Sequence, residues 1–155
     1  MKYFILFSLV MTQTIYSATA GERADGMNDV ESTFSVEETA DRLETIFAQK
    51  GVTVFNRIKH SAAAEKVGVK LRPTELIIFG NPKLGSPMMK CKQSIAIDLP
   101  QKALIWKDEN DKVWISYNDI KYIAKRHHVE DCEAIISKIE MILAKLIHAA
   151  SHASK

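Results

Sequence analysis

The sequence lacks the short motifs of several common enzyme classes. It contains no Gly-x-Ser-x-Gly elbow, no glycine-rich phosphate-binding loop and no His-Glu-x-x-His zinc motif, so the familiar hydrolase, nucleotide-binding and zinc-protease signatures are absent. It also lacks an excess of one charge, because 21 Lys and Arg side chains stand against 19 Asp and Glu. A nucleic-acid-binding domain usually carries a clear positive excess. We therefore expect no nucleic-acid partner, and the sequence leaves open whether the protein is an enzyme.

Long apolar runs are also absent, with one short exception at the N-terminus. There Lys2 precedes an apolar stretch that ends at Met11, and Ala18-Thr19-Ala20 follows after a polar segment. A helix that spans a bilayer needs roughly 20 apolar residues, which this stretch does not reach. A positive charge, a short apolar run and a small-residue site are the parts of a secretory signal. We expect residues 1–20 to be cleaved after Ala20, which leaves a periplasmic or secreted protein with no membrane contact.

Cysteine is scarce, with only Cys91 and Cys132 in the chain. An exported protein meets oxidising conditions in which two thiols can pair. A bond between them would close a loop of about forty residues and stabilise the fold by roughly 3 to 4 kcal/mol in the chain-entropy description. The sequence alone leaves open whether this disulfide forms.

The rest of the chain has the composition of one globular domain. Its 155 residues are 46% hydrophobic and 26% charged, which is ordinary for a single domain with a buried core. We expect a flexible leader over 21–27, one α+β domain over 28–150 and a disordered polar tail over 151–155.

Two segments show clear helical signals. Ser35 and Glu38 form a capping box that starts a helix, and Gly51 is suited to end it. Near the C-terminus, apolar residues recur at the spacing of a longer helix, and a stripe of that width packs across a sheet. The stripe consists of Ile135, Ile139, Ile142 and Leu146, with Ile136, Leu143 and Ile147 beside them. Short helices are expected over 61–67 and 119–126, and a loop or short helix over 83–92.

Five segments are expected to be strands, because they are rich in β-branched and aromatic residues and lie between turn residues. They cover 30–35, 52–59, 74–79, 102–107 and 113–117, and we expect the apolar run over 74–79 to be buried on both faces. This order of elements, β-α-β-β-β-β-α, predicts a two-layer α+β sandwich with a mostly antiparallel sheet and a long C-terminal helix. Helices cover one face. The other face must then be solvated, covered by the short helices or paired with a second copy.

Two short motifs occur near the middle of the domain, Phe79-Gly80-Asn81-Pro82 and Asp98-Leu99-Pro100. With other positions between residues 28 and 150, they resemble the pattern of the domain of unknown function 302 family. The resemblance implies a TATA-binding-protein-like α+β fold. It implies no function, and no DNA binding, because one fold hosts unrelated activities. The other matching positions are Val54, Phe55, Ile58, His60, Ala64, Gly68, Leu71-Arg72-Pro73-Thr74-Glu75-Leu76, Gly85, Met89, Tyr117 and Ala124-Lys125-Arg126-His127.

Five polar residues lie at predicted strand ends and turns, where they can converge around a shared hollow. A histidine beside an aspartate can act as a general base, and Asn81 or Tyr117 can donate to a developing oxyanion. An enzyme of unassigned class would use His60, Asp98 and Tyr117. Each residue also has a structural interpretation, as the end of a strand, a turn, a cap or a rim aromatic. The candidate ligand-binding residues are His60, Asn81, Asp98, Tyr117 and His127.

A second group of residues offers soft metal ligands. Thioether, thiolate and imidazole together favour copper(I) or another soft metal, and the group comprises Met88, Met89, Cys91, His127 and His128. Methionine is also a common filler of protein cores, and a disulfide at Cys91 would remove the thiolate. Cys91 and His128 depart from the family's pattern, so chemistry that rests on them is not expected to be shared by the family. We predict no cofactor and keep a soft metal as an alternative.

These observations lead to one working hypothesis and two alternatives. We expect a small periplasmic module that holds an apolar or amphipathic small molecule, or a second copy of itself, with the polar residues at the mouth of the hollow. The alternatives are an enzyme of unassigned class and a soft-metal, copper-type binding protein.

Overall fold

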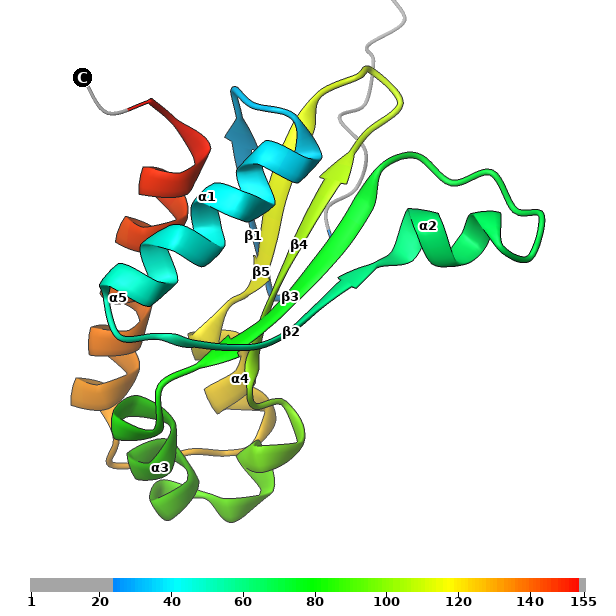
Figure 1. Ribbon diagram of the computed structural model, residues 1–155. Coiled ribbons are helices and arrows are strands. Elements are labelled where there is room, and N and C mark those ends of the chain that lie inside the picture. Colours follow the sequence, from blue (N-terminus) through cyan, green and yellow to red (C-terminus); the bar gives the residue numbers. More distant parts are fainter. Residues whose placement is uncertain (1–23, 154–155) are drawn as a thin grey trace, which may run out of the picture.

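The computed structural model describes residues 24–153, and the predicted signal over 1–20 lies outside them. In this part of the chain a five-stranded sheet is combined with helices (Figure 1). The strands are β1 (Met27–Ser32), β2 (Thr53–Lys59), β3 (Thr74–Gly80), β4 (Gln101–Lys107) and β5 (Val113–Asn118). The helices are α1 (Val36–Gln49), α2 (His60–Glu65), α3 (Pro82–Cys91), the 3₁₀ helix η1 (Gln93–Ile97), α4 (Ile120–Arg126) and α5 (Glu133–Ser151).

All neighbouring strands of the sheet run antiparallel, in the order β1-β5-β4-β3-β2. The first two strands of the chain therefore form the two edges, and α1 connects them across one face. The long helix α5 packs beside α1 on the same face (Figure 1). The predicted two-layer α+β sandwich, with its antiparallel sheet and long C-terminal helix, is confirmed.

The core lies between the sheet and the two long helices. The apolar stripe of α1 is buried, including Leu43 and Phe47, and the Phe47 ring stacks on Phe79 of β3 with ring centroids 4.3 Å apart. At the start of α1 the hydroxyl of Ser35 accepts a hydrogen bond from the amide of Glu38 at 3.2 Å. The predicted N-cap is thus confirmed, and it satisfies an amide that the helix cannot pair internally.

Strand β3 is buried on one face only, so the prediction of burial on both faces is wrong. Ile77 and Phe79 point into the core, whereas Leu76 is half-buried on the opposite face. Figure 1 shows α2 projecting beyond the sheet instead of covering that face. Leu76 is partly shielded because the strand register places it between Ile58 and Leu104. An apolar run can therefore reflect cross-strand neighbours as well as a second covering layer.

The ends of the domain differ from the predicted boundaries. Met27, expected in the leader, pairs with Asn118 as the first residue of β1. Ser151, expected to begin the tail, is the last residue of α5 and is buried. The amide of Thr33 and the hydroxyl of Ser32 donate to its carbonyl oxygen at 3.0 and 3.5 Å. Contacts from the connection between β1 and α1 thus hold the end of α5 in place.

Two tryptophans lie opposite each other on the uncovered face of the sheet, in a wide groove. The indole N–H of Trp106 donates to the hydroxyl of Ser116 at 2.8 Å, and that hydroxyl donates to Asp29 at 2.5 Å. The indole N–H of Trp114 donates to Asp108 at 2.8 Å, and this hydrogen bond is the main cause that lowers the pKa of Asp108. Both rings are therefore fixed in orientation by their polar edges.

Candidate functional site

Two of the predicted site residues meet where η1 lies against the end of α4. Oδ2 of Asp98 lies 2.6 Å from Nε2 of His127, and the hydroxyl of Ser94 lies 3.0 Å from Nδ1 of the same ring. Arg126 donates to the other oxygen of Asp98 at 3.0 Å. We call Ser94, Asp98, Arg126 and His127 the Asp98 cluster. Ser94, an exposed residue of η1, was not predicted, because nothing in the sequence marks it as the partner of a distant histidine.

The Asp98 cluster contains the residue types of nucleophilic acyl transfer. In such sites a histidine connects a serine nucleophile to an orienting carboxylate. Here, however, Ser94 is exposed and does not line the apolar pocket described below. What the cluster does in this structure is to tie η1 to the C-terminus of α4, through a histidine side chain that is 10% exposed.

His60 lies far from the Asp98 cluster. It begins α2, directly after Lys59 at one end of β2, whereas α3 begins beyond Gly80 at the other end of the sheet. In the register Lys59 pairs with Glu75 and Thr53 pairs with Gly80, so the two ends are about six residues apart, roughly 20 Å at the rise of a strand. Figure 1 shows α2 and α3 at opposite ends of the molecule. His60 is therefore not part of one shared site.

Tyr117 is buried on the face of β5 that the helices cover. Burial raises the pKa of its hydroxyl, and the negative charges of Asp119 and Glu140 raise it further. Within residues 24–153 no hydrogen bond joins Tyr117 to the Asp98 cluster. The enzyme set of His60, Asp98 and Tyr117 does not assemble, because its members lie at a sheet end, in the Asp98 cluster and in the core.

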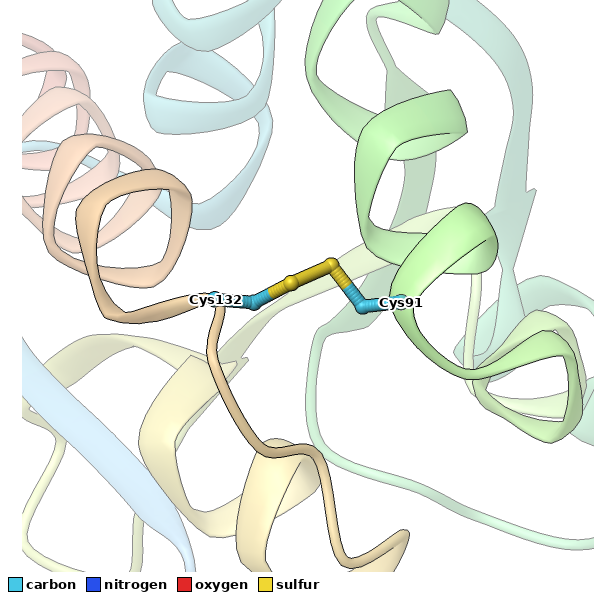
Figure 2. The surroundings of a disulfide bond; sticks show 2 residues. All are labelled: Cys91 and Cys132. Atoms are coloured by element: carbon cyan, nitrogen blue, oxygen red, sulfur yellow. A yellow bond between two sulfur atoms is a disulfide. The ribbon is translucent and has the colours of Figure 1, made fainter.

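The soft-metal set does not assemble either. Cys91, the last residue of α3, is bonded to Cys132 at the N-cap of α5 (Figure 2), so its thiolate is not available. Met88 is fully buried in the core, and His127 belongs to the Asp98 cluster. His128 is exposed in the turn after α4. No group of three or more His, Cys, Asp or Glu that could hold a metal ion occurs in the described part of the chain.

Asn81, the fifth predicted residue, is the N-cap of α3. Its Oδ1 accepts from the amide of Lys83 at 2.9 Å, and its Nδ2 donates to the carbonyl of Gly51 at 3.2 Å. The side chain thus ties the turn between β3 and α3 to the end of α1. It also lies on the rim of an apolar pocket.

This pocket has a volume of about 260 Å³ and is lined by α3, α5 and the ends of β3 and β4. The helix α5 presents Ile139, Ile142, Leu143 and Leu146 to it. The two sequence motifs contribute all of Phe79-Gly80-Asn81-Pro82 and the Leu99 and Pro100 of the second motif, and Gly85 and Met89 of α3 also face it. Many of the residues that carry the family resemblance therefore surround one cavity.

A bulge in β2 shapes the mouth of the pocket. The register with β3 shifts between Val54 and Asn56, and the intervening Phe55 is 55% exposed and lines the pocket. A Cβ atom at Gly80 would lie 3.2 Å from the Phe55 ring, which is closer than ordinary contact. Glycine at this position therefore lets the aromatic ring close against the end of β3.

Gln101 is the one strongly unusual polar group of the pocket. It is the first residue of β4, lines the pocket and is only 6% exposed. Its Nε2 and Oε1 are both buried without a hydrogen-bond partner. Every other buried side-chain nitrogen or oxygen in residues 24–153 has a partner. A buried unpaired polar group costs about 1–3 kcal/mol. Sequence reasoning missed Gln101, because a glutamine after a proline at the start of a strand is usually a surface residue.

The fold and the pocket define a small α+β sandwich domain with an apolar cavity at the end of its sheet. The sequence pattern of the family described as "Domain of unknown function DUF302" matches residues 28–146. The chain belongs to this family. A crystal structure of an uncharacterized conserved protein DUF302 from Bacillus stearothermophilus has the same fold, with a TM-score of 0.75 at 18% identity, over 83% of this chain and 100% of that one.

Curated relatives with higher identity are longer proteins. The chain is 46% identical over 102 residues to the fluoride-specific ion channel FluC 1 of Brucella suis biovar 1 (strain 1330) and to the protein of the same name from Brucella abortus biovar 1 (strain 9-941). The match covers 66% of this chain but only 40% and 38% of those proteins. Among residues 24–153, no helix combines the length and the apolar character needed to cross a membrane.

Proposed function

We propose that this chain is an exported binding domain whose pocket, between α3 and α5, holds a small amphipathic molecule. The observation that carries the proposal is the unpaired, buried amide of Gln101 inside an apolar cavity. Ligand sites are concave and mostly apolar, with a few polar groups that orient the ligand. A ligand that pairs with the amide removes its desolvation cost while its apolar part gains about 25 cal/mol for each Å² buried. The disulfide supports export, because such bonds persist in oxidising compartments.

Blocking the pocket tests this function. Gly85 lies in α3 and faces the pocket, and a Cβ there would lie 3.9 Å from Leu99, at ordinary contact distance. A Gly85→Leu side chain therefore fits the backbone but occupies the cavity. We expect it to weaken binding of N-phenyl-1-naphthylamine, an uncharged fluorescent probe, about tenfold or more, which corresponds to about 1.4 kcal/mol. Fluorescence titration of the mature protein measures this.

The control for this experiment is Ala63→Leu, which adds the same side chain to the exposed helix α2, away from the pocket. Its affinity for the probe should equal that of the unmodified protein. Native mass spectra of both proteins report retained ligand and show whether a second copy is bound instead. Equal probe affinity in Gly85→Leu and Ala63→Leu would rule out the pocket as the binding site.

A second function is favoured by the names of the curated relatives. Each is called a fluoride-specific ion channel, and the match with this chain leaves most of its length unmatched. A domain that is joined to a channel in one protein can act beside the same kind of channel as a separate chain. In this function the present domain assists a fluoride channel of its host.

Fluoride tolerance tests this second function. Deleting the gene in the native host should lower the fluoride concentration that stops growth by at least twofold, and the Gly85→Leu gene should fail to restore it if the pocket is involved. Growth in chloride at equal ionic strength is the control. Unchanged fluoride tolerance in the deletion strain would exclude a role beside the channel.

A further inference from the structure

We propose that the pocket selects an uncharged amphiphile that carries a hydrogen-bond donor and acceptor side by side, as a carboxamide does, on an aliphatic tail of about eight carbons. This inference rests on the proposed binding function and specifies the ligand of the same pocket. Three features of the cavity carry it: the chemistry of its one unpaired polar side chain, the absence of charge from its lining, and its size.

The unpaired side chain requires both a donor and an acceptor. The amide of Gln101 offers two N–H donors and a carbonyl acceptor, and both its nitrogen and its oxygen are buried without a partner. A ligand with only an acceptor would satisfy the nitrogen and leave Oε1 unpaired. A carboxamide satisfies both atoms at once, because its N–H donates to Oε1 while its carbonyl accepts from Nε2.

The lining of the pocket excludes a charged headgroup. None of the residues that line it is Asp, Glu, Lys, Arg or His, so a buried carboxylate or ammonium would have no counter-charge. Burying an ionised group without a partner costs far more than burying an amide. The amide of Asn81, also on the rim, is already engaged by Lys83 and Gly51. Ser86, the remaining polar side chain of the lining, is exposed to solvent. Gln101 is thus the buried polar side chain of the lining that lacks a partner and can orient a ligand.

The size of the cavity limits the tail to a short chain. Its volume of about 260 Å³ lies just below the range of about 300–1,000 Å³ that is typical of pockets for drug-sized ligands. An eight-carbon amide is a ligand of suitably small size. The aliphatic side chains of α5, among them Leu143 and Leu146, provide the apolar wall that the tail would contact.

A matched series of eight-carbon compounds tests the inference. Octanamide has the complete headgroup, N,N-dimethyloctanamide lacks the donor, and octanoate at pH 7.5 is charged. We expect octanamide to displace N-phenyl-1-naphthylamine at a concentration at least tenfold lower than either of the others. In Gln101→Leu, which removes both polar atoms at nearly constant volume, the preference for octanamide over N,N-dimethyloctanamide should fall below threefold.

The outcomes separate this inference from the function on which it rests. If the probe binds and Gly85→Leu weakens it, but the three compounds compete equally, the pocket binds ligands and the headgroup assignment is wrong. The assignment is also wrong if Gln101→Leu keeps the preference, or if octanoate competes as well as octanamide. If neither the probe nor any eight-carbon compound binds, the proposed function fails and this inference fails with it.

Discussion

Arg57→Leu should lower the free energy of unfolding by about 3–5 kcal/mol, because it leaves the buried carboxylate of Glu75 without its main partner. Nε of Arg57 donates to Glu75 at 2.5 Å, and Nη1 donates to Asp41 and Glu44 of α1 at 2.5 and 3.0 Å. Burial alone would lower the pKa of Arg57, but these hydrogen bonds outweigh it and raise that pKa above its ordinary value. Arg57 therefore stays charged and joins the edge strand β2 to both β3 and α1.

Urea unfolding followed by tryptophan fluorescence measures this loss. The double variant Arg57→Leu/Glu75→Leu is the matched control, since it removes both charges and leaves no unpaired group in the interior. We expect it to recover most of the stability, because apolar replacements of whole buried ion pairs are often neutral. Lys59, whose Nζ lies 3.8 Å from Glu75, remains as a weaker partner of the carboxylate in Arg57→Leu. Its charge is the reason that the expected loss of unfolding free energy begins as low as about 3 kcal/mol. If Arg57→Leu lowers the free energy of unfolding by less than about 1 kcal/mol, Arg57 is not the main partner of the Glu75 carboxylate.

The architecture could be predicted from the sequence because local signals agreed with the global fold. The cap at Ser35 marked the start of α1, and the apolar spacing in α1 and α5 required one buried face on each helix. The strands between these helices had to lie under the buried faces. Two predictions were wrong: that β3 is buried on both faces, and that α5 ends before Ser151. Burial of Leu76 depends on cross-strand neighbours, and burial of Ser151 depends on Ser32 at the far end of the chain. A one-dimensional pattern does not contain such contacts.

The candidate site could be predicted only in part. The pairing of Asp98 with His127 joins two predicted residues, but His60 lies at the wrong end of the sheet because strand direction and length decide which turns are neighbours. Gln101 was missed for a related reason. Its amide is buried in a pocket that residues of α3 and α5 also line, and α5 is more than thirty residues away in sequence, so its environment depends on tertiary packing. Most residues of the two motifs that carry the family resemblance line the same cavity.

One covalent link joins two walls of the pocket. Cys91 ends α3 and is bonded to Cys132, the N-cap of α5 (Figure 2). Both helices line the cavity. Within the domain, α3 is joined to the sheet by the turn at Asn81 and to η1 at its other end. Together with the packing of α3 against α5, the disulfide therefore limits how far α3 can move from α5.

Removing the disulfide with Cys91→Ser/Cys132→Ser should lower the free energy of unfolding by about 4 kcal/mol, the chain-entropy value for a loop of this length, since the cysteines are 41 residues apart in sequence. The double variant should also bind N-phenyl-1-naphthylamine more weakly, because the separation of the two pocket walls is no longer fixed. The unmodified protein treated with dithiothreitol should match the double variant in both measurements, which separates loss of the bond from any effect of the serines. Probe affinity that survives reduction would show that packing of α3 against α5, and not the covalent link, sets the width of the cavity. If the free energy of unfolding of the double variant lies within about 1 kcal/mol of that of the oxidised protein, the disulfide does not constrain the unfolded chain as expected.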